Sequence, residues 1–269
     1  GTGKTILALF LFKMLLSQED DVNPNYLDNL DAESIDKIKR LKAKYPSPKI
    51  AIVVPMSSFR ETLKKSFKNI KWLKPNMVIG PAELKKQEYD IVMVDEAHRL
   101  RRRKVLWAYF GAFDKVNIEL DFDKEATELD WVLKQSKKAI FFYDPKQSIK
   151  PSDIKKEDFE NLKAKTDTKV ISLHSQFRSL WWEDYVKFID KIFAGDLDSQ
   201  TIFESSQYEL FMFDSMEKFT EVIHKRDSEI WLSRIVAGYS WPWQSKKDTS
   251  LYDIEIDNTK LRWNSQSSD

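Results

Sequence analysis

The sequence predicts an α/β protein built around a parallel β-sheet. Three short apolar runs, 50–54, 91–94 and 139–143, have the length and the β-branched content of strands that are buried on both faces. Helical patterns at 6–16 and 125–137 alternate with these runs. This alternation is typical of a parallel sheet that carries helices on its faces.

Composition allows a large core and limits the class of protein. With 269 residues, of which 42% are hydrophobic and 13% aromatic, we expect one or two domains. No apolar run approaches the roughly 20 residues of a membrane span, so we expect a soluble protein without a membrane partner. The absence of cysteine excludes disulfides and thiolate metal sites and fits a cytoplasmic location. The formal net charge of +1 means that any nucleic-acid surface must be local.

The first five residues match the second half of a phosphate-binding loop, G-x-x-x-x-G-K-[ST]. Glycines let backbone N–H groups wrap phosphates, and the helix that follows adds its N-terminal dipole. Lys4 would neutralise the β- and γ-phosphates of ATP, and the Thr5 hydroxyl would ligate Mg²⁺. We therefore expect Gly1, Thr2 and Gly3 to bind the nucleotide together with these two side chains. A glycine-rich chain start that only caps a helix is the alternative.

Two acids follow the strand at 91–94, at the sheet edge where ligands of α/β proteins bind. Hard cations take oxygen ligands, so Asp95 could hold Mg²⁺ directly or through water. Glu96 would face the attacking water as its orienter or general base. An acidic pair after an apolar strand is also an ordinary strand-to-turn boundary. The phosphate-binding pattern at the chain start favours the functional interpretation.

Two later segments carry candidate catalytic residues. Gln147 follows the strand at 139–143, and its amide could donate to a γ-phosphate oxygen or hold the water. Arg178 could reach the γ-phosphate from a second domain as an arginine finger. A surface arginine that starts the helix at 181–193 is the alternative for Arg178. We expect most aromatic residues of that helix in the core, because they recur at helical spacing.

Two polar stretches could contact nucleic acid. Ser57, Ser58 and Arg60 lie just beyond the first apolar strand, where they could reach a nucleic-acid backbone. Ser58 as the N-cap of a basic surface helix is the alternative. Arg101 and Arg102 belong to the strongest basic cluster of the chain, which could contact phosphates or could be a solvated loop.

The other segments carry no motif of their own. Residues 17–49 read as a surface insertion with a charged helix near 32–44, and 105–123 reads as irregular and aromatic-rich. Further strands are expected at 78–79, 170–173, 208–213 and 229–236, with a helix at 216–225.

Four motifs, in this order, resemble motifs I, II, III and IV of superfamily 1 helicases. They are Gly3-Lys4-Thr5, Asp95-Glu96-Ala97-His98, Asp144-Pro145-Lys146-Gln147 and Gln176-Phe177-Arg178. The segments 142–149 and 237–243 are similar to a bacterial family of ATPases that is grouped with the Schlafen-type DNA/RNA helicase domain. The resemblance covers nearly the whole chain except the insertion at 17–49.

The resemblance implies a P-loop NTPase with two RecA-like domains and with ATP and Mg²⁺ in the cleft between them. We assign these domains to 1–165 and, in part, to 166–269. Gln147 would sense the γ-phosphate, Arg178 would stabilise the transition state, and His98 would couple nucleotide state to the nucleic-acid groove. The implied function is an ATP-dependent DNA/RNA helicase or translocase core that moves on single-stranded nucleic acid.

The sequence departs from the helicase pattern at both ends. The first glycine of motif I, motif V and the arginine of motif VI do not occur, so we expect a fragment that hydrolyses ATP slowly by itself. Fused or associated nuclease or defence-system components are possible partners. Two alternatives stay open: an ATPase that switches or remodels a protein partner without unwinding, and a non-catalytic regulatory domain of a defence or restriction system.

Overall fold

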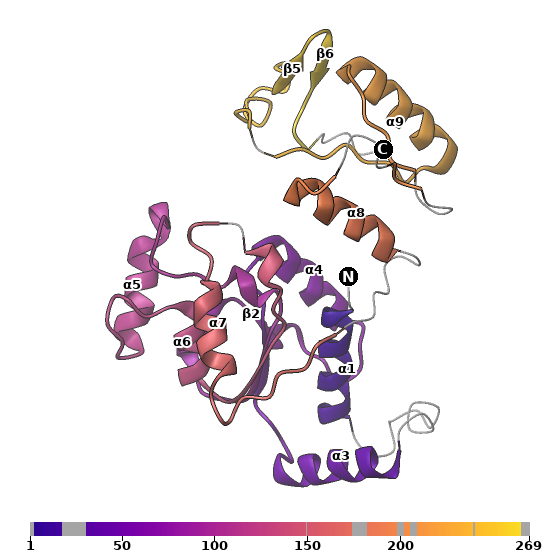
Figure 1. Ribbon diagram of the computed structural model, residues 1–269. Coiled ribbons are helices and arrows are strands. Elements are labelled where there is room, and N and C mark those ends of the chain that lie inside the picture. The colour runs from indigo at the N-terminus through magenta and orange to yellow at the C-terminus, as the bar shows by residue number, and fades with distance from the viewer. Residues whose placement is uncertain are drawn as a thin grey trace. The chain divides into compact units, whose positions relative to one another are not determined.

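The computed structural model describes residues 3–17, 31–148, 150–173, 182–197, 202–204, 209–238 and 240–264. Contacts divide the chain into two compact units, unit 1 (Gly1–Leu180) and unit 2 (Trp181–Asp269) (Figure 1). The boundary at residue 165 that the resemblance suggested stays a prediction. Within the described residues, no helix is long and apolar enough to cross a membrane.

Unit 1 is built around a four-stranded parallel sheet with the strand order β2-β1-β3-β4. Strand β1 pairs in parallel with β2 and with β3, and β3 pairs in parallel with β4. The strands are β1 (Ile50–Val53), β2 (Val78–Ile79), β3 (Tyr89–Val94) and β4 (Ser136–Phe141). The predicted fold class, α/β with a parallel sheet, is therefore confirmed, and the sheet is consistent with a RecA-like fold.

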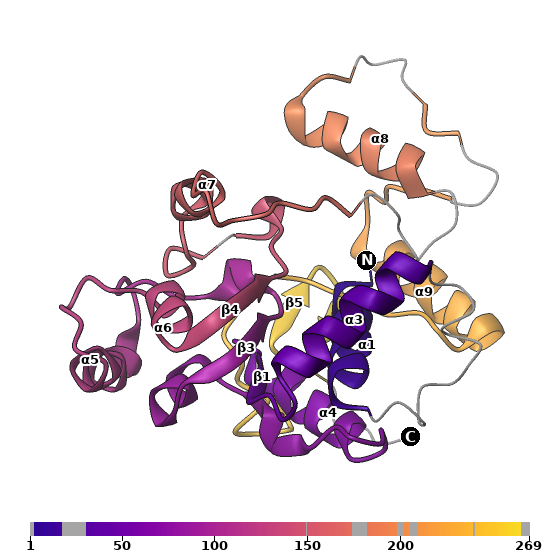
Figure 2. The ribbon, with the colours of Figure 1, turned by 90° about the horizontal axis from the view of Figure 1, so that it is seen from below.

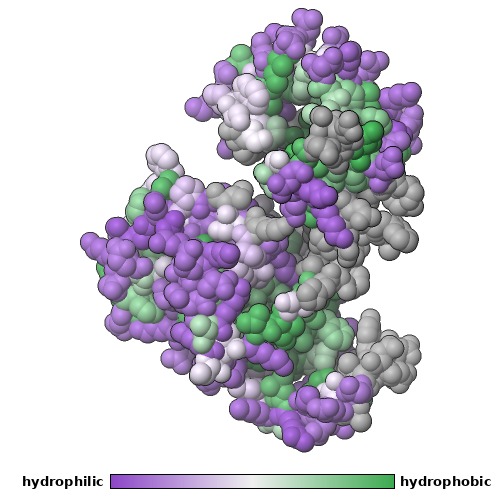
Figure 3. All heavy atoms as spheres, in the orientation of Figure 1, coloured by the Kyte–Doolittle hydropathy of each residue, from purple (hydrophilic) through white to green (hydrophobic). Residues whose placement is uncertain are grey.

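Helices cover both faces of this sheet. Figure 2 shows β1 and β3 between α1 and α4 on one side and α5 and α6 on the other. The helices of unit 1 are α1 (Lys4–Leu16), α3 (Ala32–Lys44), α4 (Ser57–Phe67), α5 (Phe110–Glu119), α6 (Glu128–Lys134) and α7 (Lys156–Lys163). The surface over α5, α6 and α7 is mainly hydrophilic in Figure 3, so these helices turn their polar sides outward.

Alternate residues of the central strands enter two separate cores, because side chains of a strand point to opposite faces. Ile52 and Met93 pack with α1 and α4, whereas Val53 and Val92 pack with α5, α6 and α7. All four side chains are fully buried. This burial on both faces explains why β1 and β3 are continuous apolar runs rather than alternating ones.

Three local predictions for unit 1 are corrected. The segment 105–123 contains helix α5, because Phe113 and Val116 bury one side of a helical turn. The helix expected at 125–137 begins only at residue 128, where Thr127 accepts a hydrogen bond from the Asp130 N–H as N-cap, and it ends before β4. Ser58 is not an N-cap, since α4 begins at residue 57 without a side-chain capping bond.

The helix expected near 32–44 is confirmed as α3. Asp31 caps it by accepting a hydrogen bond of 2.7 Å from the backbone N–H of Ser34. Lys42 on α3 donates to the carbonyl of Ser17, which directly follows α1, over 2.8 Å. The rest of the predicted insertion, 18–30, lies outside the described residues.

Short 3₁₀ helices connect several elements of unit 1. They are η2 (Pro75–Met77), η3 (Pro81–Lys86), η4 (Ala97–Arg99), η5 (Trp107–Tyr109) and η6 (Pro145–Gln147). Three of them, η3, η4 and η6, follow the carboxyl ends of β2, β3 and β4. They therefore lie along the edge of the sheet at which a ligand of an α/β protein binds.

Unit 2 contains two helices and a hairpin among its described residues. These elements are α8 (Trp182–Ala194), α9 (Met216–Ile230) and the antiparallel pair β5 (Ile254–Ile256) and β6 (Thr259–Leu261). The predicted helices at 181–193 and 216–225 correspond to α8 and α9. Tyr185 and Phe188 of α8 are partly buried and lie 5.9 Å and 5.0 Å from the Phe203 ring centroid.

The strands predicted at 170–173, 208–213 and 229–236 are wrong for the residues that the structure describes. Residues 170–173, 209–213 and 231–236 have no strand in the structure, residue 208 is outside the described residues, and 229–230 belong to α9. Met212 and Val236 are 95% and 88% exposed, so these apolar segments have no covering layer among the described residues. A second RecA-like domain stays a prediction.

Asp253→Asn is expected to loosen the hairpin region of unit 2. Asp253 is buried and accepts hydrogen bonds from the backbone N–H groups of Ser245 and Trp263, over 2.7 Å and 2.8 Å, and from the Ser245 hydroxyl. Burial raises the pKa of this carboxyl, but these hydrogen bonds outweigh burial and lower it. An amide turns one acceptor into a donor, so we expect hydrogen exchange at the two N–H groups to become about tenfold faster.

Asp248→Asn is the matched control for this substitution. The exposed Asp248 also accepts from a serine, through the N–H of Ser250 over 2.9 Å, but water can replace this bond. Because the pKa of Asp253 is lowered in the folded state, its contribution is present at neutral pH and is lost as the pH falls through that pKa. Equal exchange in both variants would contradict a structural role for Asp253.

Candidate functional site

Thr5 and Asp95 form the central contact of the candidate site. Thr5 lies in the first turn of α1, and Asp95 is the first residue after β3. The Thr5 hydroxyl donates to Oδ2 of Asp95 over 2.6 Å, and the backbone N–H of Glu96 donates to Oδ1 over 3.1 Å. The structure thus brings together the two side chains that the sequence predicted to share one Mg²⁺.

The Asp95 carboxyl is fully buried between these donors. Burial raises the pKa of Asp95 above its usual range, and the nearby charge of Glu96 acts in the same direction. The Thr5 hydroxyl, the Glu96 N–H and the charge of Lys4 oppose this rise. A buried carboxylate in such surroundings is stabilised by a cation placed beside it.

The N-terminus of α1 is open toward this carboxyl. Gly3 is the N-cap residue in a left-handed conformation, with φ 70° and ψ 18°, and no side chain of the described residues forms a capping bond at this end. Glycine adopts this conformation without steric cost. The Leu7 N–H donates to the Gly3 carbonyl over 2.9 Å, so the helical turn is formed. Gly1 and Thr2 lie outside the described residues.

Glu96 and His98 lie beside the Thr5–Asp95 pair. Glu96 has a left-handed backbone with φ 51° and ψ 47°, which is uncommon for a residue with a side chain and is typical of functional sites. Nε2 of His98 lies 3.1 Å from Oε2 of Glu96, although these atoms are not aligned as a hydrogen bond. The Ala97 N–H donates to the Phe142 carbonyl over 2.9 Å and fixes η4 to the end of β4.

His98 is 1% exposed, and its Nδ1 atom has no hydrogen-bond partner within the described part of the chain. Burial lowers the pKa of His98, and the positive charges of Arg99 and Lys4 lower it further, while Asp144 and Asp153 oppose this effect. The imidazole is therefore neutral at pH 7. The pKa of His98 thus depends both on Lys4, at the start of α1, and on Arg99, the next residue of η4.

Gln147 lies in η6, beyond the end of β4. Its side-chain amide donates to Oδ2 of Asp144 over 2.7 Å, and its backbone N–H donates to the Asp144 carbonyl over 3.2 Å. In the described part of the chain these bonds go to Asp144 rather than to Thr5 or Asp95. The other candidate for γ-phosphate contact, Arg178, lies outside the described residues.

No cluster of three or more histidine, aspartate or glutamate side chains that could hold a metal ion occurs among the described residues. A cation at the Thr5–Asp95 pair would therefore take its other ligands from phosphate and water, as Mg²⁺ commonly does. Both side chains offer oxygen atoms, which suits a hard cation.

A groove with a volume of about 840 Å³ lies beyond the carboxyl ends of the strands of unit 1. The groove is lined by parts of the segments 55–60, 80–83, 99–109 and 150–153 and by Glu128. Among the predicted nucleic-acid residues, the lining includes Ser57, Ser58, Arg60 and Arg101. His98 and Arg102 do not line it.

Backbone hydrogen bonds and ion pairs hold the basic cluster at 99–104 in place. The Ile154 N–H donates to the Leu100 carbonyl over 2.7 Å, and the Arg102 N–H donates to the Ser152 carbonyl over 2.9 Å. Arg103 forms a bidentate pair with Asp114, at 2.6 Å and 2.9 Å. Arg99 pairs with Asp153 over 3.1 Å, and the guanidinium of Arg101 lies over the Tyr109 ring at 4.9 Å. Contact of Arg101 and Arg102 with phosphates stays a prediction.

Glu128, which also lines the groove, fixes the backbone of Arg101. The Arg101 N–H donates to Oε2 of Glu128 and the Glu128 N–H donates to the Arg101 carbonyl, each over 2.9 Å. Glu128 is 2% exposed, and burial raises its pKa to about 7 although the positive charges of Arg101 and Arg60 oppose this rise. The negative charge of Asp153 also raises the pKa of Glu128. Burial raises the pKa of Tyr109 to about 12, and the charge of Glu128 acts in the same direction.

Glu128→Gln is expected to remove a pH dependence of stability. Because the folded-state pKa of Glu128 is about 7 and the usual value is 4.5, the folded chain binds more protons between these values. The free energy of unfolding therefore falls by up to about 3 kcal/mol as the pH rises from 4.5 to about 7. Urea denaturation of both proteins at several pH values measures the difference. An equal slope for both would contradict this assignment.

Several residues of the site were not singled out from the sequence. Three such residues line the groove, namely Trp107, Glu128 and Lys150. Tertiary packing places them there, and none of them belongs to a sequence motif. The aromatic content of 105–123 was a signal for Trp107. The proximity of Lys150 to Gln147 along the chain was a signal for Lys150. No sequence pattern marked Glu128 as a buried acid.

The fold and the site define the class of protein: an α/β protein whose helix-flanked parallel sheet is consistent with a RecA-like fold, with acidic residues at its carboxyl edge. The family model of the Schlafen group 3 DNA/RNA helicase domain matches residues 1–269, which is the whole chain. The chain therefore belongs to the Schlafen group 3 DNA/RNA helicase domain family. Neither a curated protein nor a solved structure matches it. The predicted membership in a helicase-like domain family is confirmed.

Proposed function

We propose that this chain is the core of an ATP-dependent DNA/RNA helicase or translocase of superfamily 1 type. It would hydrolyse ATP with Mg²⁺ and couple hydrolysis to movement on single-stranded nucleic acid. The observation that carries the proposal is the hydrogen bond between Thr5 and Asp95. It joins the start of α1 to the end of β3, two segments 90 residues apart, at the residue types that ATP and Mg²⁺ require.

The residues present fit both groups. The Thr5 and Asp95 oxygens suit Mg²⁺, which polarises phosphate oxygens and neutralises developing charge when it is bound. Lys4, directly before Thr5, is the first residue of α1 and would neutralise the terminal phosphates. The uncapped N–H groups of this helix end would donate to phosphate oxygens.

Glu96 would accept the proton of the attacking water. Its carboxylate lies next to Asp95 in the chain and is partly exposed, so water can reach it. Gln147 would hold the γ-phosphate after leaving its bond with Asp144, and Arg178 would stabilise the transition state. These roles are proposed by resemblance to the helicase motifs.

His98 would transmit the nucleotide state to the groove. The charges that shift its pKa include Lys4 and Asp144 on the nucleotide side, and Arg99 and Asp153, which line the groove. A change in charge at the nucleotide would therefore alter the pKa of His98, which also depends on charged residues of the groove. This arrangement supports a coupling role for His98.

Measurement of ATP hydrolysis with and without single-stranded DNA or RNA tests the proposal. We expect hydrolysis to be stimulated by one of the polymers, and Lys4→Ala to lower it by at least about 10²-fold because a phosphate charge loses its partner. Lys13→Ala is the matched control, since Lys13 is exposed in the last turn of the same helix. It should hydrolyse ATP like the unchanged chain.

Each outcome of this measurement has a consequence. Stimulation that Lys4→Ala abolishes supports the motor, and the more effective polymer names the substrate. Hydrolysis that is indifferent to both polymers favours an ATPase that switches or remodels a protein partner. Absence of both nucleotide binding and hydrolysis favours a non-catalytic regulatory domain.

A further inference from the structure

Trp107 is an exposed aromatic side chain at the mouth of the groove. It is 82% exposed and belongs to the lining of the groove. Its backbone is left-handed, with φ 49°, and Val105 two residues earlier has φ 52°. Bulky and β-branched residues rarely adopt this conformation, and the strain is typical of segments that serve a site.

The turn that carries Trp107 is anchored by residues before and after it in the chain. Leu106 is 6% exposed and belongs to the core, and the Tyr109 N–H donates to the Leu106 carbonyl over 2.9 Å. Tyr109 also lies beneath the guanidinium of Arg101. Trp107 thus belongs to an ordered turn that also carries Tyr109, the ring beneath Arg101.

The accessible charge of the groove is positive. Arg60, Arg101 and Lys150 line it, and none of the ion pairs in the described part of the chain involves them. The carboxylates of the lining already have partners of their own. Asp153 is buried and accepts from the Lys150 N–H over 2.9 Å besides pairing with Arg99, and Glu128 is buried below Arg101.

Glu83, the remaining carboxylate of the lining, is also engaged. It accepts from the Gly80 N–H and from Lys86, each over 3.0 Å. Gly80 in turn leaves room for Arg60, because a β-carbon at this position would collide with its guanidinium. The Arg60 side chain donates to the Val54 carbonyl over 3.1 Å, which holds it at the end of β1.

We propose that Trp107 is a stacking platform for one base of a single strand that lies in this groove, with the phosphates on Arg60, Arg101 and Lys150. An exposed indole offers a flat face on which an unpaired base can stack, and the cations match a phosphate backbone. This inference rests on the proposed function, because it names the residues by which the motor would hold its single strand.

Equilibrium binding of a fluorescein-labelled single-stranded oligothymidine, about 16 nucleotides long, tests the platform in the full chain without ATP. Trp107→Ala should weaken binding about tenfold, and Trp107→Phe should retain most of it, because the phenyl ring still stacks. Trp231→Ala is the matched control. Trp231 is 81% exposed and also left-handed, with φ 62°, but belongs to unit 2. It should bind like the unchanged chain.

An abasic strand of the same length separates stacking from a structural effect. This strand keeps the phosphates and lacks the bases, so Trp107→Ala should weaken its binding little, by less than about twofold. The slope of log affinity against log salt gives a second readout. Arg60→Ala and Lys150→Ala should each reduce the slope by about 0.7, and Trp107→Ala should leave it unchanged.

The outcomes distinguish this inference from the proposed function. If the unchanged chain binds the strand and Trp107→Ala binds equally well, the platform is wrong and the motor is not affected. An equal loss on the normal and the abasic strand would show that Trp107 only shapes the groove. If the unchanged chain binds no single strand and its hydrolysis ignores both polymers, the groove and the motor are both wrong.

Discussion

Glu96→Gln is expected to slow ATP hydrolysis by about 10²–10⁴-fold while ATP binding stays nearly unchanged. Glutamine keeps the size of the side chain but cannot accept the proton of the attacking water. The backbone N–H of Glu96, which holds Asp95 over 3.1 Å, is not affected by the substitution. The pair of Asp95 and Thr5 should therefore keep its geometry, and with it the proposed cation site.

Two measurements separate this role from a loss of folding. Binding of a fluorescent ATP analogue in Mg²⁺ should be retained in Glu96→Gln, and kcat should fall without a rise in KM. Glu88→Gln is the matched control, because Glu88 is exposed and precedes the same strand at its other end. Hydrolysis by Glu96→Gln within about twofold of the control would exclude Glu96 as the general base.

The sequence was sufficient to predict the parallel sheet and the Thr5–Asp95 pair. The runs that became β1 and β3 are apolar throughout, and a strand with this pattern is stable only when both of its faces are covered. Parallel strands and the helices between them then place the start of α1 beside the end of β3. The contact follows from topology, so motif order alone was enough to predict it.

The groove could not be predicted in the same way. Its shape depends on the pairing of 100–102 with 152–154, which joins segments about 50 residues apart in sequence. Each segment is short and carries charged residues, so neither has the period of a strand. The burial of Glu128 also depends on this packing, because Glu128 bonds to the backbone of Arg101.

The strands predicted in unit 2 failed for a different physical reason. Leu210, Phe211 and Met212 have the composition of a strand, but a strand forms only where a neighbour accepts its hydrogen bonds. The described residues supply no such neighbour, and these side chains are exposed. The first two residues of the strand predicted at 229–236 belong instead to the last turn of α9, and the rest of that segment forms no strand.

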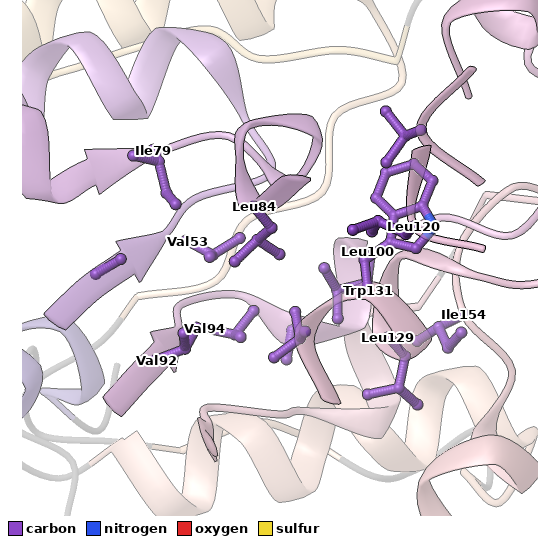
Figure 4. Close-up of a cluster of buried hydrophobic side chains, with 14 of the residues drawn as sticks. Val53, Ile79, Leu84, Val92, Val94, Leu100, Leu120, Leu129, Trp131 and Ile154 are labelled. Carbon is purple, nitrogen blue, oxygen red and sulfur yellow. The ribbon is translucent and has the colours of Figure 1, made fainter. Parts of the chain in front are cut away.

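Trp131→Ala is expected to lower the free energy of unfolding by about 3–5 kcal/mol, the largest effect on stability that we predict. Trp131 is fully buried on α6 and lies 4.6 Å from the ring of Phe113 on α5. Figure 4 shows its side chain among Leu100, Leu120 and the other residues of this core. Alanine would leave a cavity between two helices that are anchored on the sheet.

A polar network adds to this cost. Nε1 of Trp131 donates to Oδ1 of Asn117 over 2.5 Å, and Nδ2 of Asn117 donates to the Ala126 carbonyl over 3.3 Å. Because Asn117 is 1% exposed, removal of the indole leaves a buried acceptor without a partner. Trp131→Phe should therefore cost about 1–3 kcal/mol, less than alanine, since it removes the donor but keeps most of the volume.

Urea denaturation of unit 1 within the full chain measures both effects, with Trp107→Ala as the control for loss of a tryptophan. Trp107 is 82% exposed, so its substitution should change the free energy of unfolding by less than about 0.5 kcal/mol. If Trp131→Ala were as mild as this control, α5 and α6 would not share the core with the sheet. The basis for placing Arg101 and Glu128 at the groove would then fail as well, because α6 carries Glu128.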